Sequence, residues 1–312
     1  MRRLQAAALA AAIAAAAWLL VPGRGVVVEI PPGLSARQTS QLLAERGVVV
    51  WAPAFRLILR AAGVEKRLQP GFYRFRRHDW PFTVARRLAL GQTDEVKVVI
   101  PEGWRVSQVA ERLAAAGVAD AAQFEALAAQ RNWEGRLFPA TYRFPPGLGA
   151  ERAGARMVQE FDLVVGGAYS AARAPRSLPE ILILASIVER EAEKPEERPM
   201  IAAVYRNRLL RRMPLQADPT VQYALGYWKK NLSRADLKFP SPYNTYLHYG
   251  LPPGPICSPG LDSIRAALSP ARTDALYFVA DGTGGHVFSR TNEEQNRARA
   301  ATRARRTSAR AQ

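Results

Sequence analysis

The 312-residue chain has one cysteine, Cys257, and only three histidines, His78, His248 and His286, which lie far apart in the sequence. A lone cysteine cannot form a disulfide within the chain, nor can it supply a cysteine-based metal cage. Three scattered histidines also argue against a zinc site. We therefore expect no metal and no cofactor, so the function has to come from other side chains.

Acidic residues are also fewer than basic ones. The chain has 27 Asp and Glu and 44 Lys and Arg, which give a formal net charge of +17. Such an excess would suit nucleic acid, but the chain has no DNA- or RNA-binding motif. Part of the excess lies in residues 297–312, which are predicted to form a disordered basic tail that can contact anionic lipid head groups. We expect an anionic polymer, and not nucleic acid, as the partner.

One segment near the N-terminus lacks charge altogether. Residues 4–21 are apolar and rich in alanine, and they follow Arg2 and Arg3. This run is about long enough to span a bilayer, and it is long for the apolar part of a cleaved signal peptide, which is the alternative. With the arginines on the cytoplasmic side, the sequence predicts a single-pass anchor in residues 1–24. The rest of the chain would then lie outside the cytoplasm, at the cell (inner) membrane.

An internal duplication follows the apolar segment. Val28-Glu29-Ile30-Pro31-Pro32-Gly33 matches Val98-Val99-Ile100-Pro101-Glu102-Gly103, and each copy continues with an amphipathic helix that ends at Gly-Val, a second helix and an alternating Tyr-Arg-Phe strand. The pattern predicts a strand–helix–helix–strand unit in each copy. The first copy, in residues 25–97, either binds a polymer such as a glycan or serves as a spacer. The sequence pattern alone does not distinguish these two functions.

A carboxylate ends an apolar helical segment in Ala185-Ser186-Ile187-Val188-Glu189-Arg190-Glu191. Ser177 and Glu180 have capping-box spacing, which predicts a helix over about 178–193. Glu189 continues the apolar stripe formed by Ile181, Leu184, Ala185 and Val188, whereas Glu191 points elsewhere. A half-buried carboxylate is costly without a function. The candidate catalytic residue is therefore Glu189, the alternative being an ordinary helix-end Glu, and Glu191 is interpreted as a bystander.

Two rigid, proline-rich segments after this helix carry hydrogen-bonding and aromatic side chains, in residues 213–220 and 241–256. Such loops suit a carbohydrate, although the prolines could serve only to close the fold. The candidate substrate-binding residues are Asn207, Gln216, Asp218, Thr220, Tyr243, Asn244, Thr245 and Tyr246.

In order, these motifs closely resemble the endolytic murein transglycosylase family, also called YceG-like, across nearly the whole chain. The sequence departs from the family pattern at Ala140, where Asp is expected, and at Gln295, where His is frequent. The motifs are Ile100-Pro101-Glu102-Gly103, Ala185 to Glu191, Asn207-Arg208-Leu209, Leu215-Gln216-Ala217-Asp218-Pro219-Thr220-Val221, Tyr243-Asn244-Thr245-Tyr246 and Gly250-Leu251-Pro252-Pro253-Gly254-Pro255-Ile256.

The resemblance implies cleavage of the β-1,4 bond between N-acetylmuramic acid and N-acetylglucosamine within peptidoglycan strands. It implies 1,6-anhydro product ends, Glu189 as the catalytic residue, and termination of nascent strands alongside peptidoglycan synthases. A lyase needs one carboxyl group. Asp218 could instead supply a second catalytic carboxyl group, and two carboxyl groups would suit a muramidase, which is a hydrolase. The remaining alternative is a non-enzymatic tether between the membrane and the wall.

The expected fold class is α+β. An anchor in residues 1–24 precedes a small LysM-like α/β module in residues 25–97 and a larger mixed α+β catalytic domain in residues 98–296. Within that domain, residues 98–165 resemble the first module. The basic tail, residues 297–312, completes the chain.

Overall fold

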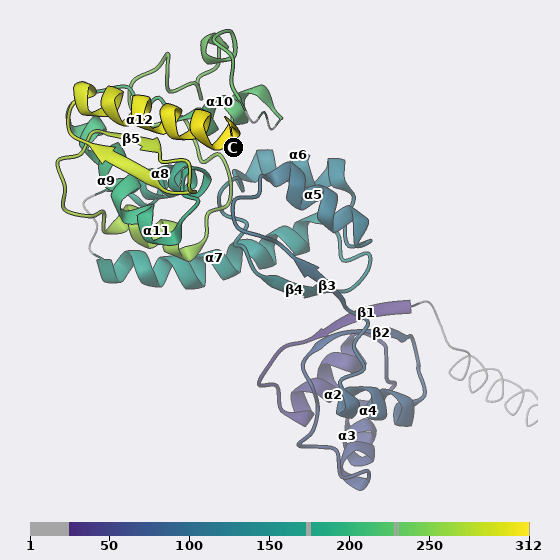
Figure 1. Cartoon of the computed structure of the whole chain (residues 1–312). Helices are drawn as coiled ribbons and strands as arrows, with labels where there is room; N and C mark the ends of the chain where they lie inside the picture. Colours follow the sequence, from purple (N-terminus) through teal and green to yellow (C-terminus); the bar gives the residue numbers. More distant parts are fainter. Residues whose placement is uncertain (1–24, 173–175, 228, 230, 312) are drawn as a thin grey trace, which may run out of the picture. The chain divides into compact units, whose positions relative to one another are not determined.

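The structure is a computed structural model that describes residues 25–172, 176–227, 229 and 231–311 (Figure 1). The chain divides into two compact units, of which the first ends at Val98 but also takes in Arg143–Leu148. The second unit consists of Val99–Tyr142 and Gly149–Gln312. The predicted anchor lies outside the described residues. None of the helices that the structure describes is both long and apolar enough to cross a bilayer.

The first unit contains the predicted strand–helix–helix–strand order, followed by a helix that the sequence pattern did not predict. Its strands pair antiparallel, with Val28 opposite Tyr73. Ser35 and Gln38 form a capping box at the first helix, since each side chain bonds the backbone N–H of the other. The elements are β1 (Gly25–Ile30), α2 (Ala36–Glu45), α3 (Ala52–Ala61), β2 (Gly71–Arg76) and α4 (Pro81–Leu90).

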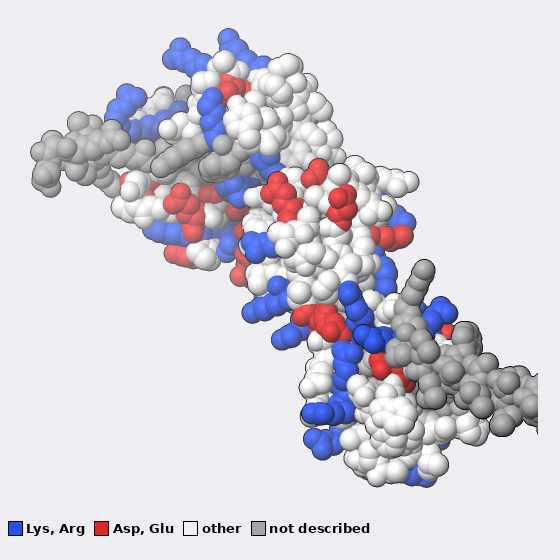
Figure 2. Space-filling view, turned by 90° about the vertical axis from the view of Figure 1, so that its right-hand side faces the viewer, with Lys and Arg blue, Asp and Glu red and all other residues white. Residues whose placement is uncertain are grey.

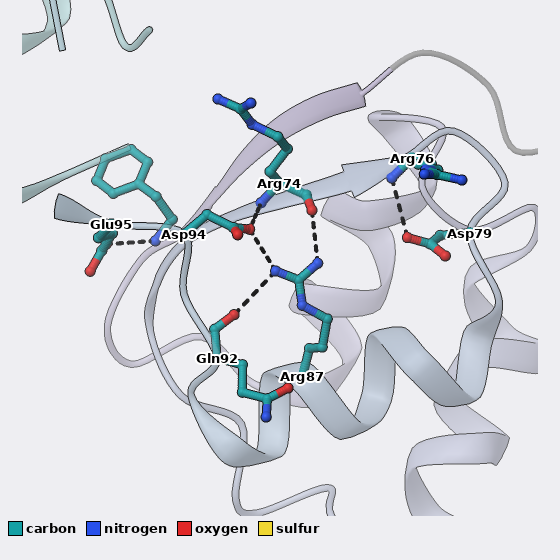
Figure 3. A network of polar contacts seen from close by, with 8 residues as sticks. Arg74, Arg76, Asp79, Arg87, Gln92, Asp94 and Glu95 are labelled. Carbon is teal, nitrogen blue, oxygen red and sulfur yellow. Dashed lines mark hydrogen bonds and ion pairs between the residues drawn. The ribbon is translucent and has the colours of Figure 1, made fainter. Parts of the chain in front are cut away.

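The free edge of β2 is covered by carboxylates instead of a third strand (Figure 3). The backbone N–H groups of alternate residues donate to carboxylate oxygens: Phe72 to Glu95 at 2.8 Å, Arg74 to Asp94 at 2.8 Å and Arg76 to Asp79 at 3.2 Å. Arg87 of α4 then bonds both Asp94 and the Arg74 carbonyl oxygen. These contacts satisfy strand donors that would otherwise invite pairing with another chain.

The second copy of the repeat has the same order of elements as the first. Its strands β3 and β4 form a separate two-stranded sheet. Gly47 and Gly117 follow corresponding helices with φ of 69° and 66°, which confirms the predicted glycine at each helix end. The elements of this copy are β3 (Val96–Val99), α5 (Val106–Ala115), α6 (Ala121–Arg131) and β4 (Thr141–Phe144).

The remainder of the chain is mainly helical, with one antiparallel pair of strands. Helices α8, α9 and α11 pack against one another, and α11 also contacts α7 (Figure 1). The elements are α7 (Ala150–Ala172), α8 (Leu178–Glu191), η1 (Pro195–Glu197), α9 (Arg198–Leu210), α10 (Asp218–Leu225), η2 (Asp236–Lys238), α11 (Leu261–Leu268), β5 (Tyr277–Ala280), β6 (His286–Ser289) and α12 (Asn292–Ala311). The described fold is thus mixed α+β, as predicted.

Helix α8 begins at the predicted capping box of Ser177 and Glu180, but it is buried on every side. Every residue from Ile181 to Val188 is buried, and not only the predicted inward stripe, because α9, α10 and α11 surround the helix. The helix ends at Glu191. Residues two positions apart on a helix point in directions about 200° apart. The two acids of the last turn, Glu189 and Glu191, therefore enter different surroundings.

The charge excess is spread over the surface. Figure 2 shows Lys and Arg scattered over the visible face, with Asp and Glu among them. The stretch 297–312 was expected to be disordered, but the structure places most of it in helix α12, which reaches Ala311. Alanine and arginine are strong helix formers, a preference that the charge of a segment does not reveal.

Two glycines of α7 should respond in opposite ways to replacement by alanine. A Cβ at Gly154 would lie 2.0 Å from a ring atom of the buried Trp133, whereas a Cβ at Gly166 would meet nothing within 4 Å. We expect Gly154→Ala to lower the free energy of unfolding by about 1–3 kcal/mol through overpacking. Gly166→Ala should raise it by about 0.5–1 kcal/mol. Urea denaturation of both variants measures this, and equal effects would contradict the described packing.

Candidate active site

A cavity of about 440 Å³ in the second unit brings together residues from distant parts of the chain. It lies at the C-terminal end of α8, and α9, the segment that leads into α10, β5 and α12 all contribute to its lining. Most of the lining residues have side chains that can donate or accept hydrogen bonds. The lining residues are Glu191, Tyr205, Arg208, Leu215, Gln216, Asp218, Leu237, Tyr246, Phe278, Gln295 and Arg299.

Glu191, the last residue of α8, is the carboxylate that α8 contributes to this cavity. The hydroxyl of the buried Tyr205 donates a hydrogen bond to Glu191 Oε1 at 2.6 Å. Burial raises the pKa of Glu191 to about 7; the Tyr205 hydrogen bond opposes this rise, the charge of Asp218 adds to it, and Arg208 opposes it. Near neutral pH, Glu191 can therefore both donate and accept a proton.

Three predicted substrate-binding residues, Gln216, Asp218 and Tyr246, also line the cavity. The hydroxyl of Tyr246 donates to Asp218 Oδ1 at 2.6 Å, so the two side chains hold each other in place. Gln216 has φ of 50°, an uncommon backbone conformation for a residue other than glycine, and its N–H donates to the Thr245 carbonyl oxygen at 3.1 Å. The structure thus brings together an amide, a carboxylate and a phenol beside Glu191.

The other five candidate binding residues are not among the lining residues, and four of them use their polar side-chain groups inside the fold. The Asn207 amide donates to the carbonyl oxygens of Thr273 and Ala275, at 2.8 and 3.0 Å. The hydroxyls of Thr220 and Thr245 lie 2.9 Å apart, and Thr245 also accepts the Ala217 N–H. The two threonines therefore shape the loop that carries Gln216, whereas Asn207 ties α9 to the segment that precedes β5.

The remaining two, Asn244 and Tyr243, lie on the second proline-rich loop. The amide of Asn244 donates to the carbonyl oxygens of Leu237 and Phe239, at 3.1 and 2.9 Å. The Tyr243 ring packs against the Tyr223 ring with centroids 4.7 Å apart. Both residues therefore stabilise the loop that precedes Tyr246.

Glu189 is not among the residues that line the cavity, and its side chain is 8% exposed. Its Oε2 accepts hydrogen bonds from the Gly260 N–H at 3.0 Å and the Ser263 hydroxyl at 2.7 Å, while Oε1 lies 3.6 Å from the guanidinium of Arg198. Glu102 contacts the same guanidinium, and burial, followed by the charge of Glu189, raises the pKa of Glu102. Glu189 thus ties the end of α8 to the start of α11.

Several lining residues were not among the candidates taken from the sequence. Arg208 belongs to the Asn207-Arg208-Leu209 motif, but it is buried, and its guanidinium donates to the carbonyl oxygens of Leu276 and Leu215, each at 2.7 Å. Tyr205 of α9 belongs to none of the motifs identified in the sequence. Gln295 and Arg299 lie on α12, part of which had been assigned to a disordered tail. The departure at Gln295 was the one signal in the sequence that pointed to α12.

The raised pKa of Glu191 predicts a pH-dependent contribution to stability. Its ordinary value is 4.5 and its folded value about 7, so the folded protein binds this proton more tightly than the unfolded chain. The stabilisation is complete below pH 4.5 and is lost as the pH rises through about 7. Glu191→Gln removes this loss. We expect the variant to gain more thermal stability relative to wild type at pH 8 than at pH 4.5, and a difference that stays constant with pH would contradict it.

Within the described ranges, no three Asp, Glu, His or Cys side chains gather as metal ligands would. The cavity instead offers one carboxylic acid poised near neutrality, a second carboxylate held by a phenol, and amide and guanidinium donors. This set can transfer a proton to and from a bound polyol and can hold its hydroxyl and amide groups.

Comparison with known proteins places this chain in a family. Residues 28–301 match the model of the YceG-like family. An endolytic murein transglycosylase of Bacillus subtilis is 32% identical over 302 residues, which cover 88% of this chain and 84% of the relative. One from Streptococcus pneumoniae is 31% identical and covers 87% of this chain, but only 57% of the longer relative. The crystal structure of a YceG-like protein from Listeria monocytogenes superposes with a TM-score of 0.58 at 33% identity, covering 88% of this chain and 99% of that one.

Proposed function

The chain belongs to the YceG-like family and is a lytic transglycosylase like its named relatives, and we propose that it cleaves the β-1,4 bond between N-acetylmuramic acid and N-acetylglucosamine within peptidoglycan strands. One product then ends in 1,6-anhydro-N-acetylmuramic acid. We assign the chemistry to Glu191, in place of the residue chosen from the sequence, Glu189. The reaction takes place in the cavity that Glu191 lines with Gln216, Asp218 and Tyr246.

The observation that carries this proposal is the placing of a single acid with a pKa of about 7 among hydrogen-bonding side chains in an open cavity. A general acid works best when its pKa lies near the working pH. Glu189 does not line the cavity, and its oxygens already accept bonds from Gly260 and Ser263 and face Arg198. A carboxylate whose oxygens are already hydrogen-bonded within the protein stabilises the fold.

One carboxyl group can carry out both halves of the reaction. Protonated Glu191 donates its proton to the oxygen that links the two sugars, and the bond from that oxygen to C1 of the muramic acid breaks. The resulting carboxylate accepts the proton of the muramic acid's own 6-hydroxyl as O6 bonds to C1. One C–O bond replaces another, Glu191 regains its proton, and no water is consumed.

A second candidate function is a muramidase, a hydrolase that uses two carboxylates. The observation that favours it is that Asp218 lines the same cavity as Glu191. In a hydrolase, Asp218 would activate a water or act as the nucleophile. In the lyase, Asp218 and Tyr246 hold sugar hydroxyls, and the negative charge of Asp218 helps to keep Glu191 protonated.

Digestion of isolated murein distinguishes an enzyme from a non-enzymatic tether. The full-length wild-type chain should release soluble anhydro-ended fragments, and the Glu191→Gln chain should bind the same murein without releasing them. Fragments from neither protein, with co-sedimentation of both, would support the non-enzymatic tether. Fragments from both would remove Glu191 from the chemistry.

We place the reaction on the outer side of the cell membrane, on newly made strands next to peptidoglycan synthases, so that the enzyme terminates their elongation. The apolar segment in residues 1–24 and its short link to β1 support this placing. The first unit then either binds glycan in the manner of a LysM module or acts as a spacer. If an exported chain without residues 1–24 leaves strand lengths in cells as they are with the full chain, anchoring is not needed.

A further inference from the structure

Helix α12 forms one wall of the cavity that contains Glu191. The helix packs against β5 and β6 (Figure 1). Gln295 and Arg299 lie one turn apart on α12, so they share a face of the helix, and both line the cavity. This wall comes from the far end of the sequence, part of which had been expected to form a disordered basic tail.

The orientation of the Gln295 amide follows from its single described partner. Gln295 Nε2 lies 2.9 Å from the carbonyl oxygen of Phe278 in β5. A backbone carbonyl oxygen can only accept, so the amide nitrogen must face it and the amide oxygen must lie at the other end. The side chain is 2% exposed, and Oε1 has no hydrogen-bond partner among the described residues.

A buried carbonyl oxygen without a partner is uncommon, because leaving it unpaired costs its full desolvation free energy. Two hydrogen-bond donors among the other lining residues are already engaged elsewhere. The guanidinium of Arg208 is bonded to Leu276 and Leu215, and the hydroxyl of Tyr205 is bonded to Glu191. Gln295 Oε1 is therefore a buried acceptor without a partner, on a residue that lines the cavity, and a ligand that brings a donor would complete it.

Arg299 differs from Gln295 in being exposed. Within the part of the chain that the structure describes, its guanidinium has neither an ion pair nor a hydrogen bond. A guanidinium group binds a carboxylate through two parallel hydrogen bonds in one plane, a bidentate arrangement. Together the two side chains offer an acceptor with a free lone pair and, one helical turn further on, a free cation.

We propose that α12 is a substrate-binding wall, on which Gln295 Oε1 accepts the N–H of an acetamido group and Arg299 pairs with a carboxylate of the peptide attached to the glycan. This inference rests on the proposed function, since both groups belong to peptidoglycan. It adds to that function a specificity for N-acetylated, peptide-bearing strands. Neither residue takes part in the proton transfer, so the effects should fall on KM.

The test compares full-length wild type with three variants, Gln295→Leu, Arg299→Glu and Arg297→Glu. The last is the matched control, because Arg297 is exposed on the same helix but does not line the cavity. The substrates are glycan strands with their peptides and strands stripped of peptides by an amidase. Melting temperatures are recorded alongside kcat and KM.

We expect Gln295→Leu to raise KM by about 5- to 10-fold on both substrates with kcat nearly unchanged, the effect of one lost hydrogen bond. Arg299→Glu should raise KM about tenfold on peptide-bearing strands only, and Arg297→Glu should change neither. An unchanged KM for Gln295→Leu would mean that Oε1 meets only water and would overturn its role. Equal effects of Arg299→Glu on both substrates, or none, would overturn the peptide contact.

Failure of the proposed function can be told apart from failure of this inference. If the wild-type chain cleaves neither substrate, the lyase assignment is wrong, whatever the variants do. The wall is then tested by co-sedimentation of the Glu191→Gln chain with peptide-bearing strands, with and without Arg299→Glu. Weaker sedimentation of the double variant supports the wall, and equal sedimentation contradicts it.

Discussion

Replacing Glu191 with Gln is expected to lower kcat for glycan cleavage by about 10³-fold, within the range that a positioned general acid contributes. Gln keeps the shape of the side chain and can still accept the Tyr205 hydroxyl, so the fold should be preserved. It cannot, however, donate an acidic proton to the glycosidic oxygen or take one from the 6-hydroxyl. Release of anhydro-ended fragments from murein, followed over time, gives the rate.

The matched variant is Glu189→Gln, which makes the same chemical change two positions earlier on the same helix. Its kcat should stay within about tenfold of wild type, because Glu189 lies outside the lining of the cavity. The reverse result, an inactive Glu189→Gln and an active Glu191→Gln, would restore the assignment made from the apolar stripe.

Replacing Glu189 with Ala should instead weaken the fold, by about 3–5 kcal/mol in the free energy of unfolding. The change leaves the Gly260 N–H and the Ser263 hydroxyl without their acceptor. Among the described residues, Arg198 then keeps only the partly exposed Glu102 as an acidic partner. Because these contacts hold α8 to α11, their loss should separate two helices of the core. Urea denaturation, monitored by circular dichroism, measures the change.

Glu193→Ala provides the control for this effect, since Glu193 is an exposed acid close to Glu189 in the sequence. We expect a change within about 0.5 kcal/mol, as for most surface substitutions. If Glu189→Ala proves equally mild and yet abolishes cleavage, Glu189 contributes to the reaction and the described contacts do not explain its presence.

Local patterns predicted much of the fold because they depend on neighbouring residues. The capping box at Ser177 and the glycines at positions 47 and 117 are fixed by backbone geometry within one turn of a helix. Helix α4 has no side-chain cap at Trp80, although Pro81 begins it and Gly91 ends it, and it was not predicted. The repeat was found because its two copies confirm each other.

The site was harder to predict because it depends on what surrounds α8. A helix with one buried face identifies its inward residues by spacing, but α8 is buried all round, so the spacing that selected Glu189 had no power to choose between the two acids. Gln216, Asp218 and Tyr246 were predicted as binding residues because they stand on rigid loops, and they line the cavity. Asn207 and Thr220 have the same chemistry, and only tertiary contacts reveal that their polar groups are used inside the protein.

The central claim is that Glu191 drives an intramolecular exchange of one C–O bond for another. Digestion of murein in water enriched in ¹⁸O, followed by mass spectrometry of the muramic acid ends, tests it most directly. We predict ends that lack ¹⁸O and are lighter than hydrolysis products by one water. Incorporation of ¹⁸O at those ends would contradict the account and would favour a hydrolase that uses Asp218 with Glu191.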